Sequence, residues 1–261
     1  MPLVLLHGLS SNSRIWDLTA PLLTEHFRVV AVDARGHGLS DKPSSYSAAE
    51  VTGDLGGVMD HLHLDRAVVA GHSWGASVAL QFAAENPSRA AAIALVDGGI
   101  MEISARMSWE EAERQMRPPE IDGVPVERFL SFARQWPDMA DLWNDQVQEM
   151  VLSNFEVREG RIYRRLTIAN HMKILRSMYE NETSQMLGVI DCPALVIIAS
   201  QEPSNELAGR WMEWRREGAK QAEEKLRRGR LIWMEDTIHD VPVQRPRELA
   251  EAIIGFADGL A

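Results

Sequence analysis

Short runs of apolar residues recur near both ends of the chain, separated by longer segments with helical spacing. Each run is too short for a helix, and it lacks the strict alternation of a strand with one face in water. Such runs between helices are typical of parallel strands covered on both faces. We therefore expect an α/β fold with a mostly parallel, doubly wound sheet, its strands within residues 2–8, 28–34, 66–72, 91–99, 193–200 and 230–236.

The sequence also predicts where three of the helices begin or end. Ser47 and Glu50 have the spacing of a capping box ahead of apolar residues that share one helical face. A second helix starts directly after Ser73 and stops at Pro87, because proline cannot continue a helix. The last helix starts near Pro246 and has an apolar stripe. These helices alternate with the predicted strands, as a doubly wound sheet requires.

The alternation of strands and helices fails in the middle of the chain. For about 90 residues the sequence is rich in Met and Trp and shows helical spacing without strand-like runs. A segment of this length is too long for a loop in a compact domain. Helices are plausible at 126–135 and 167–180. We interpret this segment as a helical cap inserted into one core, so that the core comprises residues 1–99 and 191–261 and the cap residues 100–190.

A charged segment in the second part of the core is longer than the other connections. Residues 203–230 include WMEWRREGAKQAEEKLRR, which has the pattern of a helix with many charged positions. We expect a solvated surface helix in which Trp211 and Trp214 turn inward.

The composition is that of a soluble globular protein with an acidic surface. Of 261 residues, 38 are Asp or Glu and 27 are Lys or Arg, so the formal net charge is −11. This charge argues against nucleic acid or an anionic membrane as the main partner. We find no signal-peptide pattern and no apolar stretch of the roughly 20 residues that span a bilayer. The single cysteine, Cys192, suits a reducing compartment, and we expect a cytoplasmic protein.

One serine stands where it can act as a nucleophile. Residues 70–76 read AGHSWGA, so Ser73 lies between Gly71 and Gly75 at the junction of a predicted strand and a predicted helix. A sharp turn at such a junction lifts the serine hydroxyl above the sheet, and the small neighbours let backbone segments pack closely. The first amides of the helix point toward a developing anion. This context predicts a nucleophile elbow.

A hydroxyl nucleophile needs a base, and His239 is the histidine best placed for that role. It lies between the last predicted strand and the last helix, at the sheet edge where Ser73 also lies, because parallel strands end on one side. It can take the serine proton and return it to the leaving group. His171, in the cap, is interpreted as a packing residue or a substrate contact. Other histidines lie at helix or strand ends, namely His61, His63 and His72.

Four segments in order resemble the α/β-hydrolase fold family. LLHGLSSNSRIW resembles its oxyanion segment, VDARGHGLSDKP the loop after the next strand, GHSWGA the nucleophile elbow, and HDVPVQRPRELAEAIIGF the catalytic histidine with its closing helix. The resemblance covers the core outside the cap. It implies that the backbone N–H groups of Leu9 and Trp74 form the oxyanion hole, and that His7 and residues 35–40 are structural supports.

The acid that orients the catalytic histidine has two candidates. The family pattern allows an acid after the strand at 193–200, usually as Gly-x-x-Asp. Here the segment ASQEP has Ala199 in place of the glycine and Glu202 in place of the aspartate. It also allows an acid after the strand at 91–99, where LVDGG supplies Asp97 followed by two glycines. Either carboxylate could hold the imidazole in its productive tautomer. Asp97 is preferred, and Glu202 remains the alternative.

The resemblance implies a serine hydrolase of carboxylic esters or lactones that works through an acyl-enzyme on Ser73. The apolar cap suggests a small hydrophobic substrate. A C–C bond hydrolase or a cofactor-free perhydrolase would use the same residues, and a ligand receptor could keep them. Epoxide hydrolases and haloalkane dehalogenases are disfavoured, because those relatives place Asp at the elbow. No metal, phosphate or dinucleotide motif is present, so we expect no cofactor.

One edge of the predicted sheet is expected to need a partner. The family usually has two strands before the segment LLHG, whereas this sequence starts at the third. The strand within residues 28–34 would then be an open edge with unpaired backbone groups and apolar side chains. Native proteins cover such edges, because open edges promote aggregation. We therefore expect a homodimer, or another part of the chain, to bury this strand.

Overall fold

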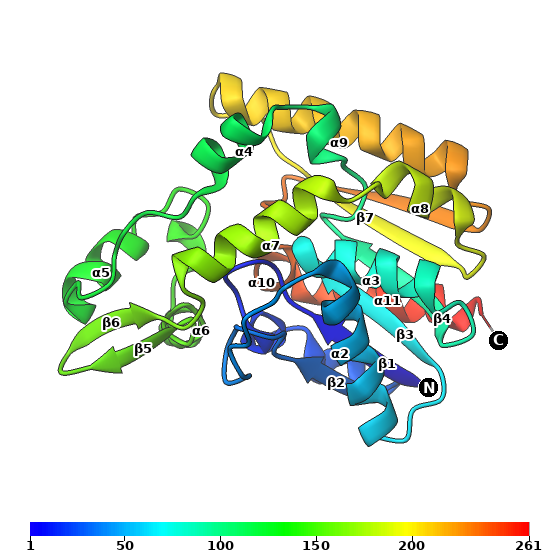
Figure 1. The fold of residues 1–261 in the computed structure, drawn as a ribbon, viewed down its shortest axis with the longest axis horizontal. Helices are drawn as coiled ribbons and strands as arrows, with labels where there is room; N and C mark the ends of the chain where they lie inside the picture. Colours follow the sequence, from blue (N-terminus) through cyan, green and yellow to red (C-terminus); the bar gives the residue numbers. More distant parts are fainter. Residues whose placement is uncertain (261) are drawn as a thin grey trace.

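A six-stranded sheet forms the centre of the computed structural model, which describes residues 1–260 (Figure 1). Its strands are all parallel and follow the order β2-β1-β3-β4-β7-β8. This confirms the predicted α/β fold, and each predicted strand is present. The strand bounds are β1 Pro2–Leu6, β2 Arg28–Val32, β3 Ala67–His72, β4 Ala90–Val96, β7 Ala194–Ser200 and β8 Gly229–Glu235.

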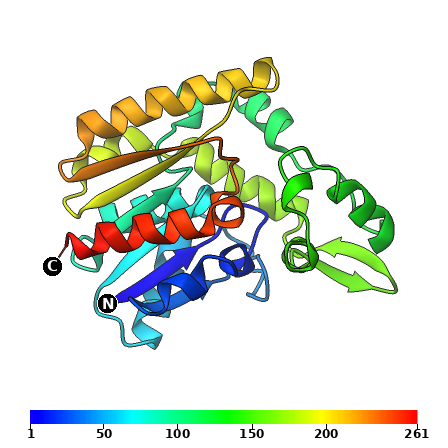
Figure 2. The same ribbon diagram turned by 180° about the vertical axis from the view of Figure 1, so that it is seen from behind.

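Helices cover both faces of the sheet, and α11 crosses one face in Figure 2. On that face lie the 3-10 helix η1 and the α-helices α1, α10 and α11, whereas α2, α3, α8 and α9 pack on the other. Within residues 1–260 none of the helices is both long and apolar enough to cross a bilayer. Their bounds are η1 Ser13–Trp16, α1 Ala20–Leu23, α2 Ala48–His61, α3 Trp74–Glu85, α8 Thr183–Val189, α9 Glu206–Lys225, α10 Val241–Gln244 and α11 Pro246–Asp258.

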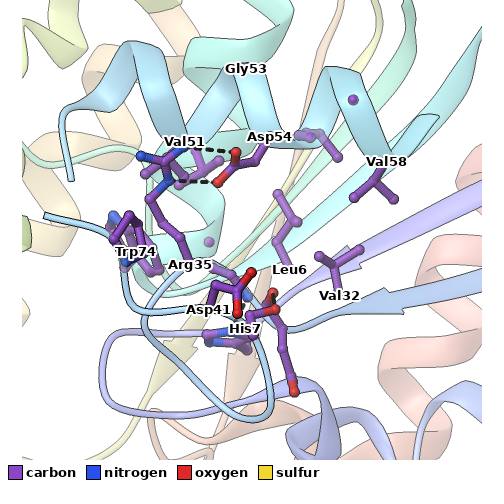
Figure 3. Close-up of a pocket in the computed structure, with 18 of the residues that line it drawn as sticks. Leu6, His7, Val32, Arg35, Asp41, Val51, Gly53, Asp54, Val58 and Trp74 are labelled. Carbon is purple, nitrogen blue, oxygen red and sulfur yellow. Dashed lines mark hydrogen bonds and ion pairs between the residues drawn. The ribbon is translucent and has the colours of Figure 1, made fainter. Parts of the chain in front are cut away.

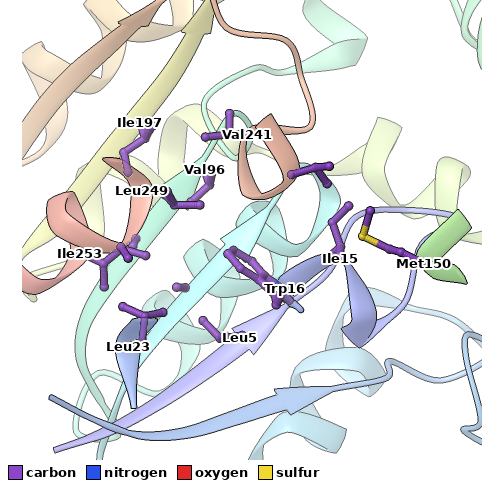
Figure 4. Packing of buried hydrophobic residues seen from close by; sticks show 14 of the residues in the cluster. Leu5, Ile15, Trp16, Leu23, Val96, Met150, Ile197, Val241, Leu249 and Ile253 are labelled. Atoms are coloured by element: carbon purple, nitrogen blue, oxygen red, sulfur yellow. The ribbon is translucent and has the colours of Figure 1, made fainter. Parts of the chain in front are cut away.

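The two faces have separate apolar cores because side chains alternate along each strand. In β1, Leu5 points into the core beneath α11, whereas its neighbour Leu6 points into the core beneath α3. Figure 4 shows the first core, in which Leu5 and Trp16 of η1 pack with Leu249 of α11. Burial on both sides explains why the strands are apolar almost throughout.

Residues 100–190, the inserted segment, lie between β4 and β7; much of this segment extends beyond the sheet at the left of Figure 1, whereas α8 packs on the sheet. Several helices form here as predicted, but β5 and β6 pair as an antiparallel hairpin where the sequence predicted no strand. Glu159 and Gly160 make its turn with φ angles of 50° and 70°. The elements are η2 Ile103–Ala105, α4 Trp109–Met116, α5 Val126–Ala133, η3 Ala140–Leu142, α6 Asp145–Leu152, β5 Phe155–Arg158, β6 Arg161–Arg164 and α7 Ile168–Glu180, followed by α8.

Strand β2 forms one edge of the sheet and pairs only with β1 among the described residues 1–260. Its residues Val30 and Val32 are half-buried. A cavity of about 710 Å³ lies between this edge and α2 (Figure 3). Its walls are largely apolar, and the ion pair between Arg35 and Asp54, with an N–O distance of 2.6 Å, lies among the residues that line it.

Candidate active site

Ser73 occupies a strained turn between β3 and α3. Its backbone has φ 55° and ψ −117°, a conformation that costs a non-glycine residue of order 1–3 kcal/mol and that recurs at functional sites. Close packing imposes the turn. A Cβ atom on Gly71 would lie 2.0 Å from the carbonyl oxygen of Gly75, and a Cβ on Gly75 would lie 2.6 Å from that of Leu6. Any side chain at Gly71 or Gly75 would therefore clash with the backbone of a neighbouring segment.

The loop that follows β1 passes directly beside this serine. A Cβ atom on Gly8 would lie 3.1 Å from Ser73 Cβ and 3.6 Å from Ser73 Oγ, so the backbone that continues to Leu9 is adjacent to the hydroxyl. Trp74 is the first residue of α3, where backbone N–H groups have no partner within the helix. Both predicted oxyanion residues thus belong to segments that border Ser73.

His7 and His37 hold this loop in place. His7 donates from Nδ1 to the Gly8 carbonyl at 2.8 Å and accepts the Ala34 N–H at Nε2 at 3.0 Å. His37 accepts the Ser10 N–H at 3.3 Å. Accepting a hydrogen bond requires an uncharged ring, and burial lowers the pKa of His7 and brings that of His37 to about 3. Both side chains are structural supports.

His171 connects the inserted segment to the same loop. Its Nε2–H donates to the Met116 carbonyl at 3.1 Å, which leaves Nδ1 to accept the Ser10 hydroxyl at 2.8 Å. The residue is 6% exposed and is absent from the walls of the cavity that contains Ser73. Of its two predicted roles, the structure supports packing.

His239 and Asp97 form a short hydrogen bond at the carboxyl edge of the sheet. The Nδ1–H of His239 donates to Oδ2 of Asp97 at 2.5 Å. This bond fixes the tautomer and leaves Nε2 of the ring free to accept a proton. Partial burial opposes protonation, but the hydrogen bond and charge of Asp97 outweigh it and raise the His239 pKa above its ordinary value of 6.5. The His239 side chain remains 45% exposed.

The Asp97 carboxylate is buried but well satisfied. Its side chain is 1% exposed, and burial alone would raise its pKa. Donors on both oxygens reverse that effect and lower the pKa: His239 and Arg215 Nη2 donate to Oδ2, the latter at 2.9 Å, and the Ala199 N–H donates to Oδ1 at 3.1 Å. Asp97 itself has a positive φ of 44°, a backbone conformation that non-glycine residues seldom adopt.

Glu202 lies in the exposed loop after β7. Within residues 1–260 it makes no hydrogen bond with His239 and does not line the cavity that contains Ser73. The structure therefore brings Ser73, His239 and Asp97 together and leaves the second candidate acid outside. Asp97, which follows the end of β4, already accepts the hydrogen bond from His239 Nδ1, so this position is not open to Glu202.

His72, the residue before Ser73, positions the His239 loop. Its Nε2–H donates to the His239 carbonyl at 2.8 Å, and the two rings lie 4.8 Å apart between centroids. Burial lowers the His72 pKa to about 4, so the ring is uncharged at neutral pH. The hydrogen bond ties the loop after β8 to the end of β3.

The three residues share a cavity of about 270 Å³ between the sheet and the inserted segment. Three methionines, Ile103 and Trp211 form the apolar part of its outer wall. A few polar side chains lie among them. Besides Ser73, Asp97 and His239, the lining includes Trp74, Ser77, Met101, Ile103, Met116, Met178, Asn181, Thr183, Trp211 and Arg215.

The family follows from a match that spans almost the whole sequence. A model described as the alpha/beta hydrolase family matches residues 3–252. The chain belongs to this family. The matched range includes the elbow, the loop after β1, Asp97 and the His239 loop.

Curated relatives match this chain over short stretches. A soluble epoxide hydrolase from a Corynebacterium species is 42% identical over 86 residues, which are 33% of this chain and 30% of the relative. A 2-(acetamidomethylene)succinate hydrolase from Mesorhizobium japonicum is 38% identical over 98 residues, 37% of this chain and 35% of the relative. The matches thus span about a third of the length of these relatives.

Solved structures resemble this chain along almost its whole length. An E-2-(acetamidomethylene)succinate hydrolase superposes with a TM-score of 0.77 at 20% identity, covering 98% of this chain and 91% of the other. The enol-lactonase from Burkholderia xenovorans gives 0.73 at 20% identity with the same coverage. At this identity the likeness shows the fold alone.

Arg215 is the residue of this candidate site that sequence analysis missed. Its helix was expected to be a solvated surface helix, yet its guanidinium reaches the carboxylate of Asp97. A signal was present, because Arg215 follows Trp211 by four residues and so lies on the face expected to turn inward. No grouping of three or more metal-ligating side chains occurs among residues 1–260.

Proposed function

We propose that this protein is a serine hydrolase that cleaves carboxylic esters or lactones through an acyl-enzyme on Ser73. The observation that carries the proposal is the 2.5 Å hydrogen bond between His239 and Asp97 in the cavity that also contains the strained Ser73. A nucleophile, a base and an orienting acid with these roles are sufficient for acyl transfer.

In the proposed reaction, Nε2 of His239 takes the proton of Ser73 Oγ as the oxygen attacks the acyl carbonyl. The N–H groups of Leu9 and Trp74 stabilise the resulting oxyanion. The imidazolium, stabilised by Asp97, then gives its proton to the departing alkoxide, and the acyl-enzyme remains. Water enters and attacks the acyl carbonyl while His239 removes its proton; the bond from the acyl carbon to Ser73 Oγ then breaks, the imidazolium returns the proton to Oγ, and the acid is released.

The cavity supports a small hydrophobic substrate. At about 270 Å³ it lies near the lower end of the volumes that hold small ligands, roughly 300–1,000 Å³. Met101, Met116 and Met178 supply flexible apolar contacts, which suit a short acyl chain or a small lactone ring.

The side chain at the elbow argues against epoxide or haloalkane chemistry, although an epoxide hydrolase is among the relatives. Those reactions use a carboxylate nucleophile, and this chain carries Ser73 at that position. C–C bond hydrolysis and perhydrolysis remain alternatives with the same triad. A ligand receptor on this scaffold would bind an ester without turning it over.

The test is hydrolysis of p-nitrophenyl esters of increasing acyl length and of γ- and δ-lactones by wild type and Ser73→Ala. The variant should lose at least about 10³-fold in kcat/KM, because the triad acts as a unit. The exposed Ser88 provides a matched control, and Ser88→Ala should behave as wild type. Comparable rates in wild type and Ser73→Ala, or no turnover by wild type, would contradict the proposal.

A further inference from the structure

Asp97 Oδ2 accepts hydrogen bonds from two side chains at once. One is Nδ1 of His239 at 2.5 Å and the other is Nη2 of Arg215 at 2.9 Å. A triad acid needs only the first bond to orient the imidazole. The guanidinium is largely buried, with its side chain 19% exposed, and it comes from α9, which packs over the edge of the cavity.

The ion pair supplies a charge that the imidazole cannot supply in the resting enzyme. Neutral His239 donates a hydrogen bond to Asp97 but carries no positive charge, and an uncompensated buried carboxylate is costly. Arginine keeps its charge at every physiological pH. Arg215 therefore adds a permanent charge to the hydrogen bonds from His239 and Ala199 that favour the ionised form of Asp97, while His239 is free to accept a proton.

The same contact limits how strongly Asp97 attracts a proton to His239. Because the two donor nitrogens share one oxygen, the guanidinium lies well within the roughly 6 Å over which one charge shifts another's pKa. Its positive charge opposes protonation of the imidazole, against the stronger effect of Asp97. We propose that Arg215 is a positioning residue that holds Asp97 and extends the action of His239 as a base to lower pH.

The other ionisable groups around His239 do not replace this effect. His72 packs against the ring but is uncharged at neutral pH. Asp240, on the same loop, favours protonation of His239, yet its side chain is 39% exposed and its charge is screened by solvent. Among residues 1–260, Arg215 is thus the cation that contacts the Asp97–His239 pair.

The inference rests on the proposed function, and it is tested by the pH dependence of inactivation of Ser73 by a fluorophosphonate, which needs no known substrate. In Arg215→Met the midpoint of the acid limb should rise by about one pH unit, because a like charge has been removed from beside the imidazole. On the acid limb, inactivation at a fixed pH should then be about ten-fold slower than in wild type.

Three further variants separate charge from packing. Arg215→Gln can donate a hydrogen bond without charge and should show the same upward shift, and it keeps the test available if the Met variant does not fold. Arg215→Lys should return the midpoint toward wild type. Arg216 is the exposed neighbour on α9, and Arg216→Met should leave the midpoint unchanged.

A spectroscopic titration distinguishes failure of this inference from failure of the proposed function. The ¹⁵N shifts of the His239 ring report its pKa in the full chain whether or not Ser73 is reactive. A higher pKa in Arg215→Met and Arg215→Gln than in wild type supports the role of Arg215. An unchanged or lower pKa in both variants overturns it, whereas absence of any phosphonylated Ser73 in wild type contradicts the proposed function alone.

Discussion

The carboxylate of Asp97 accepts hydrogen bonds from a backbone amide, an arginine and a histidine, so its position is fixed on several sides. Replacing it by the isosteric amide should present the wrong hydrogen-bonding group to His239 Nδ1. In Asp97→Asn we expect kcat to fall about 10⁴-fold, because the same replacement in a serine protease triad stabilises the wrong tautomer of the histidine at a cost of that size.

Glu202 provides the matched comparison for this measurement. Because its side chain is exposed in the loop after β7, Glu202→Gln should change kcat less than about two-fold, as surface substitutions away from a site normally do. Both variants should be assayed with one p-nitrophenyl ester. Equal and small effects would mean that the orienting acid lies elsewhere.

The pH dependence of the wild-type enzyme follows from the state of His239. Only the neutral imidazole can take the serine proton, and its pKa is raised above 6.5 by Asp97 despite the opposing effect of burial. The value of kcat/KM should therefore rise with pH through a midpoint above 6.5 and then level off. At pH 6.5 it should lie below half of the plateau, and a midpoint below that pH would contradict the assignment.

At the scale of single residues, the sequence singled out Ser73 and His239 as candidate nucleophile and base but gave only a preference for Asp97 over Glu202 as the acid. Ser73 and His239 sit in local contexts that the sequence displays, a strand–helix junction and a loop before the last helix. Asp97 and Glu202 both follow strands, so their difference lies in contacts between distant segments. The ion pair between Arg215 and Asp97 joins residues 118 positions apart, so the spacing on α9 can indicate that Arg215 faces inward but not which residue it contacts.

At the scale of elements, the end of β4 packs directly on the nucleophile turn. A Cβ atom on Gly98 would lie 2.2 Å from the carbonyl oxygen of Ser73, which is backbone and cannot move aside. Gly98→Ala should therefore destabilise the protein by about 3 kcal/mol, at the upper end of typical overpacking, and displace Ser73. Urea unfolding and esterase activity measure the two effects.

Gly57 on the exposed face of α2 is the control for this substitution. A Cβ there meets nothing within 4 Å, so Gly57→Ala should keep full activity and raise the free energy of unfolding by about 0.5–1 kcal/mol through helix propensity. Equal stability of the two variants would show that the contact between Gly98 and Ser73 is not tight.

The elements of the core were predictable because each carries a strong periodic signal, whereas the β5–β6 hairpin was not. The strands of the sheet are continuous apolar runs, and α2 begins at the predicted capping box of Ser47. β5 and β6 are four residues each and carry arginines at three of their four ends. Such strands are specified by pairing with each other and by packing on α5 and α6, which short-range patterns do not show.

At the scale of the whole molecule, the outer edge of β2 is open within residues 1–260 and borders the cavity beside α2. We propose that a second copy pairs along this edge, because an uncovered edge with half-buried valines favours strand addition. Light scattering should then give the mass of a dimer, and the amides of residues 29–32 should exchange slowly with deuterium.

A charge placed on the same edge tests this prediction. Ala31 is exposed on β2, and Ala31→Lys should convert the dimer to a monomer, because the lysines of two copies would approach each other. Ala140 is exposed in the inserted segment, and Ala140→Lys should leave the mass unchanged. A monomeric wild type with rapid exchange at residues 29–32 would count against the dimer.

Asp97 also lies three residues before the inserted segment begins at residue 100, so any opening of that segment starts close to the carboxylate that His239 contacts. The backbone that follows is fixed in place: Gly98 and Gly99 pack on the elbow, and a Cβ on Gly218 of α9 would lie 2.6 Å from the Ile100 carbonyl oxygen. A pivot for opening must therefore lie at Met101 or beyond. An opening of the inserted segment about such a pivot would leave the contact between Asp97 and His239 in place.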